Sequence, residues 1–220
     1  MPPKYSQRVR SKPDYRLADG SSVVGVTTAL RILDKSTFLV PWAVKMTKEG
    51  VDAARYRDEK AMIGTLAHAM CLSTLKGEPP DHYDYSQREV DLATNAFGKF
   101  VAWTKAHTLE PTLVEQGLVS EVHRFGGTPD YYGLIDGIPT LMDLKTGNLY
   151  PEHWYQMGAY CILLEEAGHR VEQRILLNIG RDETENFVEA KRSGPALEDE
   201  KTIFLACKTI YEAKRRLKIE

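Results

Sequence analysis

The segment GGTPDYYGLIDGIPTLMDLKTG, residues 126–147, constrains the fold of this chain more than any other stretch. It contains two runs of β-favouring residues, 128–134 and 140–145, separated by the dipeptide Asp136-Gly137. An Asp-Gly pair between two such runs is a strong signal for a tight turn. We therefore expect two antiparallel strands that pair directly as a hairpin.

Three charged side chains gather on this expected hairpin. Asp130 lies on the first strand and Asp143 on the second, and Lys145 follows two residues after Asp143. Because side chains alternate along a strand, Asp143 and Lys145 leave the same face. Two carboxylates suit a hard divalent cation such as Mg²⁺, which activates water and neutralises developing charge, and a lysine can assist either task. The pattern therefore indicates a metal site that acts on a phosphodiester.

The hairpin and two further segments resemble one group of enzymes. Pro129-Asp130 followed by Asp143-Leu144-Lys145 resembles the signature of the PD-(D/E)XK nuclease superfamily. The run Gly64-Thr65-Leu66-Ala67-His68 resembles the upstream histidine motif of its RecB-like and λ-exonuclease-like (phage-type exonuclease) branch. The run Gln156-Met157-Gly158-Ala159-Tyr160 resembles the downstream QxxxY motif of that branch. The short PD…DxK pattern is weak alone, but the motifs follow the order of the family across residues 64–160, which is more specific.

The resemblance implies an α/β fold of the restriction-endonuclease-like type, in which helices flank a mixed central β-sheet. The 220 residues suit one such nuclease domain with a proper core. We expect residues 1–60 to form an N-terminal extension, a hairpin plus helices, and residues 61–220 to form the nuclease core.

The resemblance also implies roles for individual residues. It places Asp130, Asp143, His68 and the backbone carbonyl of Leu144 at a Mg²⁺ or Mn²⁺ ion. Neutral imidazole is a good ligand for Mn²⁺ and related ions. The resemblance also gives Lys145 the task of positioning or deprotonating the attacking water, or of stabilising the pentavalent phosphorane.

Gln156 and Tyr160 form the last pair of candidates. They lie four residues apart on an expected helix and therefore share one face. In the family this face looks toward the active site, which implies that Gln156 orients Lys145 or touches a phosphate and that Tyr160 contacts the DNA strand. Ordinary helix packing is the alternative for both.

A third acid is left open between two glutamates. We expect residues 112–122 to form one central strand, on which Glu115 and Glu121 are six residues apart and face the same side. The resemblance favours Glu115 as a further residue of the metal site, because the family often places an acid after a valine on this strand. A solvent-facing glutamate is the alternative for each.

Composition limits the kinds of partner. The net charge of −2 excludes a uniformly basic surface, so DNA contacts require local patches. Basic runs at residues 4–16 and 208–218 are the candidates, and solvated chain ends are the alternative. No apolar run approaches the ~20 residues that span a bilayer, and the first ten residues lack an apolar signal core. We expect a cytoplasmic protein of a bacterial or phage-infected cell that does not bind membranes.

The cysteines bear on the cofactor. Cys71, Cys161 and Cys207 are dispersed along the chain, which fits a reducing compartment. Some relatives carry an iron–sulfur cluster, which needs four cysteine ligands. We therefore expect no iron–sulfur cluster here.

These expectations combine into a metal-dependent exonuclease that hydrolyses double- or single-stranded DNA. The resembled branch serves recombination and repair and includes phage enzymes. The alternatives are a DNA endonuclease of the same fold and a non-catalytic DNA-binding or assembly module with a vestigial site. The sequence leaves open whether the chain forms a homo-oligomer or binds a recombination partner protein.

Overall fold

The centre of the molecule is a five-stranded mixed β-sheet, seen in a computed structural model that describes residues 13–33, 36–78, 85–182 and 185–219. The strands stand in the order β3-β6-β7-β8-β9. Only β7 and β8 are parallel, and the other neighbours in this sheet are antiparallel. The strands are β3 (Leu109–Val114), β6 (Tyr131–Ile135), β7 (Ile138–Lys145), β8 (Gln173–Ile179) and β9 (Phe187–Arg192).

The predicted hairpin forms the middle of this sheet as β6 and β7. Asp136 and Gly137 connect the strands with positive φ angles of 52° and 80°, as a two-residue type I′ turn requires. The antiparallel register pairs Tyr131 of β6 with Met142 of β7. Asp130 precedes Tyr131 and Asp143 follows Met142, so these two acids lie beside each other. Asp130 therefore precedes β6 directly instead of lying within it.

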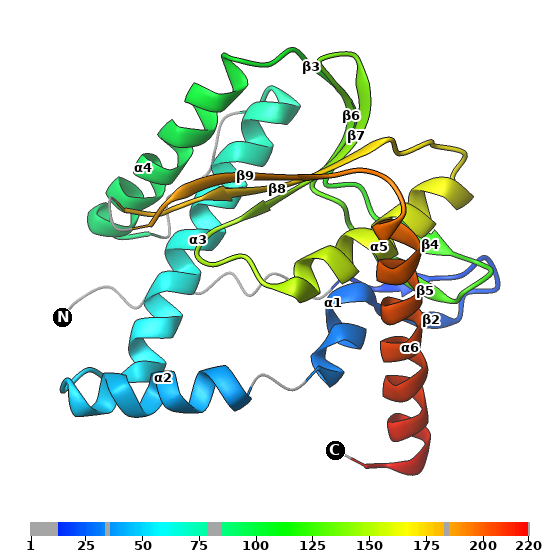
Figure 1. Ribbon diagram of the computed structural model, residues 1–220, viewed down its shortest axis with the longest axis horizontal. Coiled ribbons are helices and arrows are strands. Elements are labelled where there is room, and N and C mark those ends of the chain that lie inside the picture. Colours follow the sequence, from blue (N-terminus) through cyan, green and yellow to red (C-terminus); the bar gives the residue numbers. More distant parts are fainter. Residues whose placement is uncertain (1–12, 34–35, 79–84, 183–184, 220) are drawn as a thin grey trace.

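Helices cover both faces of the sheet (Figure 1). On one face α3 (Ala53–Lys76) and α4 (Gln87–Thr104) pack on a core that includes Met142 and Ile175. On the other face α5 (Pro151–Glu166) and α6 (Ala196–Leu217) pack on a core that includes Leu141 and Leu176. The predicted α/β class, a mixed central sheet flanked by helices, is confirmed. No described helix is long and apolar enough to cross a membrane.

α5 connects the parallel strands β7 and β8. The chain therefore leaves the end of the hairpin and passes over one face of the sheet before it starts β8. α6 then packs closely on α5. A Cβ atom at Gly158 would lie 2.8 Å from backbone atoms of Glu200 and Lys201, so a glycine is needed where the two helices meet. This glycine is the central residue of the QxxxY segment.

A second, smaller sheet contains the predicted N-terminal hairpin. Its order is β1-β2-β5-β4, and β2 pairs with β5 in parallel. The strands are β1 (Tyr15–Arg16), β2 (Ser22–Gly25), β4 (Leu118–Ser120) and β5 (Phe125–Gly127). Three helices come directly after β2 in the chain. They are α1 (Val26–Ala29), the 3₁₀ helix η1 (Leu30–Ile32) and α2 (Ser36–Lys48). The boundary expected after residue 60 falls within α3 and remains a prediction.

One predicted element is wrong. Residues 112–122 do not form a single strand, because β3 ends at Val114 and β4 begins at Leu118 in the other sheet. Glu115 separates them with a φ angle of 51°, a left-handed conformation that a continuous strand does not contain. Glu115 and Glu121 therefore do not share one strand face.

Candidate active site

Asp143 and Lys145 lie at the end of β7, on the sheet face that α5 covers. The Nζ atom of Lys145 is 2.5 Å from Oδ2 of Asp143, and the Asp143 side chain is only 2% exposed. Burial raises the pKa of Asp143 to about 6, the positive charge of Lys145 opposes that shift, and the negative charge of Asp130 adds to it. The carboxyl group therefore changes its protonation close to neutral pH, which is common among groups that take part in chemistry.

Asp130 is held from the opposite side of the sheet. Its Oδ2 atom accepts a hydrogen bond from the backbone N–H of Leu144 at 2.8 Å and lies 2.9 Å from Nε2 of His68 on α3. Burial alone would raise the pKa of Asp130, but the charge and hydrogen bond of His68, together with Lys145 and the Leu144 N–H, keep it below its usual value. Asp130 is therefore the carboxylate that stays ionised.

Gln156 connects the residues on the α5 side. Its Oε1 atom accepts a hydrogen bond from Lys145 at 3.1 Å, while Nε2 donates to Asp143 at 3.2 Å and to the Tyr160 hydroxyl at 2.8 Å. Burial first, and then the nearby negative charges of Asp143 and Asp130, raise the pKa of Tyr160 well above its usual value. The predicted shared face of Gln156 and Tyr160 thus points at the acid–lysine pair.

Gly64 sets how closely α3 approaches this site. A Cβ atom at this position would lie 2.4 Å from Oγ1 of Thr146, the residue that follows Lys145. The neighbour that requires a glycine here is therefore a threonine side chain. Thr146 escaped the sequence analysis, although its position directly after the lysine was the available signal.

The two candidate glutamates lie in different surroundings. The backbone N–H of Glu115 donates to the carbonyl oxygen of Asp130 at 3.0 Å, and its carboxylate is 2.8 Å from Nζ of Lys76 at the end of α3. Glu121 instead accepts a hydrogen bond from the backbone N–H of Ala18 in the second sheet. Glu115 therefore adjoins Asp130 through its backbone, and Lys76 is a neighbour that the sequence did not indicate.

The donor set fits a small divalent cation. Oδ2 of Asp143 is buried and makes no hydrogen bond with good geometry despite its closeness to Lys145. A strand residue directs its N–H and C=O toward the same neighbour, so the Leu144 carbonyl faces the side on which Asp130 lies. Within the described ranges no three His, Cys, Asp or Glu side chains are grouped to bind a metal. Mg²⁺ commonly needs only one or two carboxylates, with waters and substrate phosphates as its other ligands.

Of the two basic runs, the structure describes all of the second but only part of the first. Residues 4–12 of the first run are outside the described part of the chain, and Arg16 is paired with Asp14. The second run lies on the last turns of α6, which extends away from the sheet (Figure 1). The second run is therefore not placed beside Asp143.

Comparisons with known proteins yield only distant similarities. No protein-family model and no curated protein matches the chain. Two crystal structures of the alkaline exonuclease LHK-Exo from Laribacter hongkongensis are similar. The dAMP complex is 17% identical, with 89% of this chain and 93% of that chain covered and a TM-score of 0.37. The second structure is 15% identical, with coverages of 88% and 92% and a TM-score of 0.38.

A provisionally assigned exonuclease from Eubacterium rectale is also similar in structure. It is 10% identical, with 86% of this chain and 70% of that chain covered and a TM-score of 0.47. A fold hosts many activities, and similarities this distant say nothing of chemistry. What the chain does therefore has to be inferred from its own residues.

Proposed function

We propose that this chain is a metal-dependent deoxyribonuclease that hydrolyses phosphodiester bonds as an exonuclease. The observation that carries the proposal is the contact between Lys145 and the buried Asp143, with Asp130 beside them. A lysine, an ionised carboxylate and a carboxyl group with a raised pKa form a suitable donor set for a divalent cation and a phosphate. Ordinary stabilisation of the sheet is a poor explanation, because burying such charges costs free energy.

The proposed metal-binding groups are Asp130, Asp143, the Leu144 carbonyl and His68. When bound, Mg²⁺ or Mn²⁺ would lower the pKa of a water molecule and neutralise charge on the phosphate. Asp130 is pre-aligned by the Leu144 N–H and by Nε2 of His68, the ring nitrogen that faces Asp130. The acid of Glu115 is the proposed supporting group next to Asp130.

Lys145 is the proposed cation beside the attacked phosphate. Its Nζ atom is held between Asp143 and Gln156, so its position is fixed before substrate binds. Charged groups that are already in place need no costly reorganisation during the reaction. Tyr160 keeps its proton because of its raised pKa, and it fixes the Gln156 amide through their hydrogen bond. Gln156 is therefore the residue that aligns Lys145.

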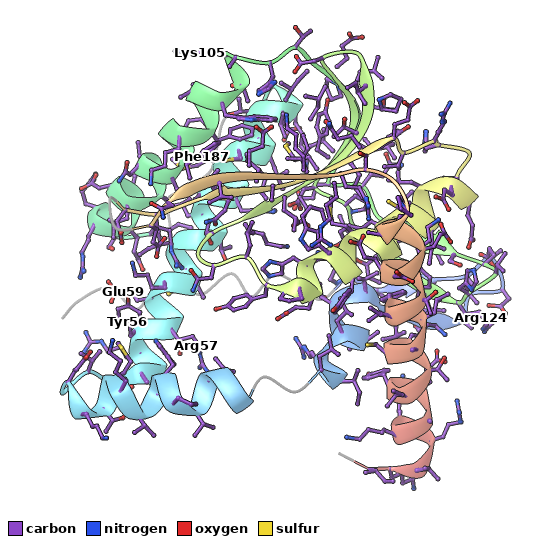
Figure 2. The ribbon with its side chains drawn as sticks, viewed as in Figure 1. Tyr56, Arg57, Glu59, Lys105, Arg124 and Phe187 are labelled. Carbon is purple, nitrogen blue, oxygen red and sulfur yellow. The ribbon has the colours of Figure 1, made fainter. Side chains whose placement is uncertain are left out.

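The test is digestion of end-labelled linear duplex, single-stranded and closed circular DNA. Each is incubated with Mg²⁺, Mn²⁺ or EDTA, using the wild type, Lys145→Ala and Lys105→Ala. Lys105 ends α4, well away from α5, and provides a matched loss of one lysine (Figure 2). We expect metal-dependent loss of linear DNA with the wild type and Lys105→Ala, and none with Lys145→Ala.

The other outcomes separate the alternatives. Cleavage of the closed circle would identify an endonuclease, because a circle offers no end. Absence of cleavage of every substrate by folded wild-type protein would contradict the catalytic proposal and favour a DNA-binding module. Recombination and repair, and a phage origin, enter this proposal only through the sequence resemblance.

A further inference from the structure

Arg57 lies on the side of α3 that faces the candidate active site. It precedes Gly64 by seven residues and His68 by eleven, close to two and three complete helical turns. Gly64 adjoins Thr146 and His68 adjoins Asp130, so their direction marks the site side of the helix. Arg57 therefore points toward that side, further along α3.

The picture of the side chains agrees with this geometry. Figure 2 shows Arg57 on the side of α3 that looks toward α1 and α5, with Tyr56 and Glu59 on the other side. The side chain of Arg57 is 66% exposed. Its guanidinium group is therefore accessible to a large ligand that passes along α3 from the site.

The interaction that Arg57 makes within the chain is easily replaced. Its guanidinium group lies 2.9 Å from Oδ1 of the adjacent Asp58, which is itself 65% exposed. Such exposed ion pairs contribute little to stability. By contrast, Lys60 is only 20% exposed and is 2.8 Å from Asp182, in a more sheltered pair. Of these two cations, Arg57 is the better placed to bind an incoming anion.

The distance along the helix defines which part of a substrate could reach Arg57. Eleven residues at ~1.5 Å each place it about 16 Å from His68 along the helix axis. The phosphates of one DNA strand wind around the helix axis, so neighbouring phosphates lie farther apart than the axial rise of about 3.4 Å per nucleotide. Arg57 would therefore meet a phosphate a few nucleotides from the one at the site.

We propose that Arg57 binds a backbone phosphate of the substrate strand, a few nucleotides from the phosphodiester that lies at Asp143 and Lys145. This inference rests on the proposed nuclease function and adds the path of the bound strand, which runs along the site side of α3. A guanidinium group suits this role because its planar donors pair with two phosphate oxygens at once. The contact carries no sequence preference, because every nucleotide offers the same phosphate.

The chain provides a matched control on the same helix. Arg55 is also exposed and lies two residues before Arg57, so it points to nearly the opposite side of α3. Arg55→Gln and Arg57→Gln each remove one positive charge at nearly the same height along α3, but from opposite sides of the helix. A difference between the two variants therefore reports direction along the helix surface instead of net charge.

The experiment measures binding of fluorescein-labelled oligothymidine by anisotropy in EDTA over a range of KCl concentrations. With an oligonucleotide of about twelve residues, we expect Arg57→Gln to weaken binding about tenfold and to reduce the slope of log K against log salt by about 0.7. Arg55→Gln should keep the wild-type slope. With a dinucleotide, all three proteins should bind alike, because a single phosphodiester cannot lie at the site and at Arg57 at once.

Equal losses in both variants, or no loss in either, would overturn the inference. These results also separate it from the proposed function. DNA hydrolysis by the wild type with an unchanged Arg57→Gln slope would refute the strand path and keep the nuclease. The expected slope difference without hydrolysis would keep the strand path and refute the nuclease. A wild type that binds no DNA would refute both.

Discussion

Replacing Gly64 with alanine tests whether the close contact between α3 and Thr146 is needed. The new Cβ atom would lie 2.4 Å from Oγ1 of Thr146, well inside van der Waals contact. Gly98 in α4 is the matched control, because a Cβ atom there has no heavy atom within 4 Å. Both glycines lie inside helices, so both substitutions gain the same intrinsic helix propensity.

The magnitude follows from these opposing contributions. Glycine to alanine inside a helix stabilises by roughly 0.5–1 kcal/mol. Overpacking at a tight contact costs typically 1–3 kcal/mol. Gly98→Ala should therefore gain about 1 kcal/mol, and Gly64→Ala should have a free energy of unfolding about 1–3 kcal/mol below that of Gly98→Ala.

Urea denaturation of both variants measures this difference, and digestion of linear DNA measures the effect on Lys145, which adjoins Thr146. The double variant Gly64→Ala/Thr146→Ala removes Oγ1 and leaves the Cβ of residue 146 at 3.5 Å, an ordinary contact. We expect it to recover both stability and cleavage. Equal stabilisation by Gly64→Ala and Gly98→Ala would refute the reasoning.

Three further results are expected. Mn²⁺ affinity, followed by electron paramagnetic resonance, should fall about tenfold per pH unit below about 6, because Asp143 must lose its proton to bind a metal; a flat affinity from pH 4 to 6 would contradict this role. In EDTA, the raised pKa of Asp143 means that its stabilising neutral form is fully present below its ordinary value of 3.8 and is lost as the pH rises through about 6. Asp143→Asn should therefore gain up to about 3 kcal/mol relative to the wild type between pH 4 and pH 8 in urea denaturation, and a constant difference would count against the shift. Glu200→Gln should lower the free energy of unfolding by about 3–5 kcal/mol, because it leaves the buried Arg174 without its charged partner; a loss below 1 kcal/mol would show that the pair matters little.

Local patterns in the sequence predicted the part of the fold that lies at the site. The Asp136-Gly137 turn and its flanking β-favouring runs were enough to predict β6 and β7, because turn chemistry and strand pairing act between neighbours. The spacing of Gln156 and Tyr160 likewise predicted a shared helix face, and their hydrogen bond confirms it. Their catalytic roles remain predictions.

Arrangements that depend on distant partners were not predictable in the same way. The run 112–122 has strand-like composition throughout, but β3 pairs with β6 whereas β4 pairs with β5 in another sheet. The parallel pairing of β2 with β5 joins segments about one hundred residues apart, and no local signal encodes it. The sequence did not single out Arg57, because charges of both signs surround it, and its direction becomes informative only once His68 is placed.

The position of Asp130 between the two helical layers has a consequence for folding. His68 reaches the site from the α3 face of the sheet, and Gln156 reaches it from the α5 face. An intermediate in which only one layer has docked would contain much of the native helix but would lack half of these contacts. The complete set of contacts around the candidate site therefore forms only when both helical layers have docked on the sheet.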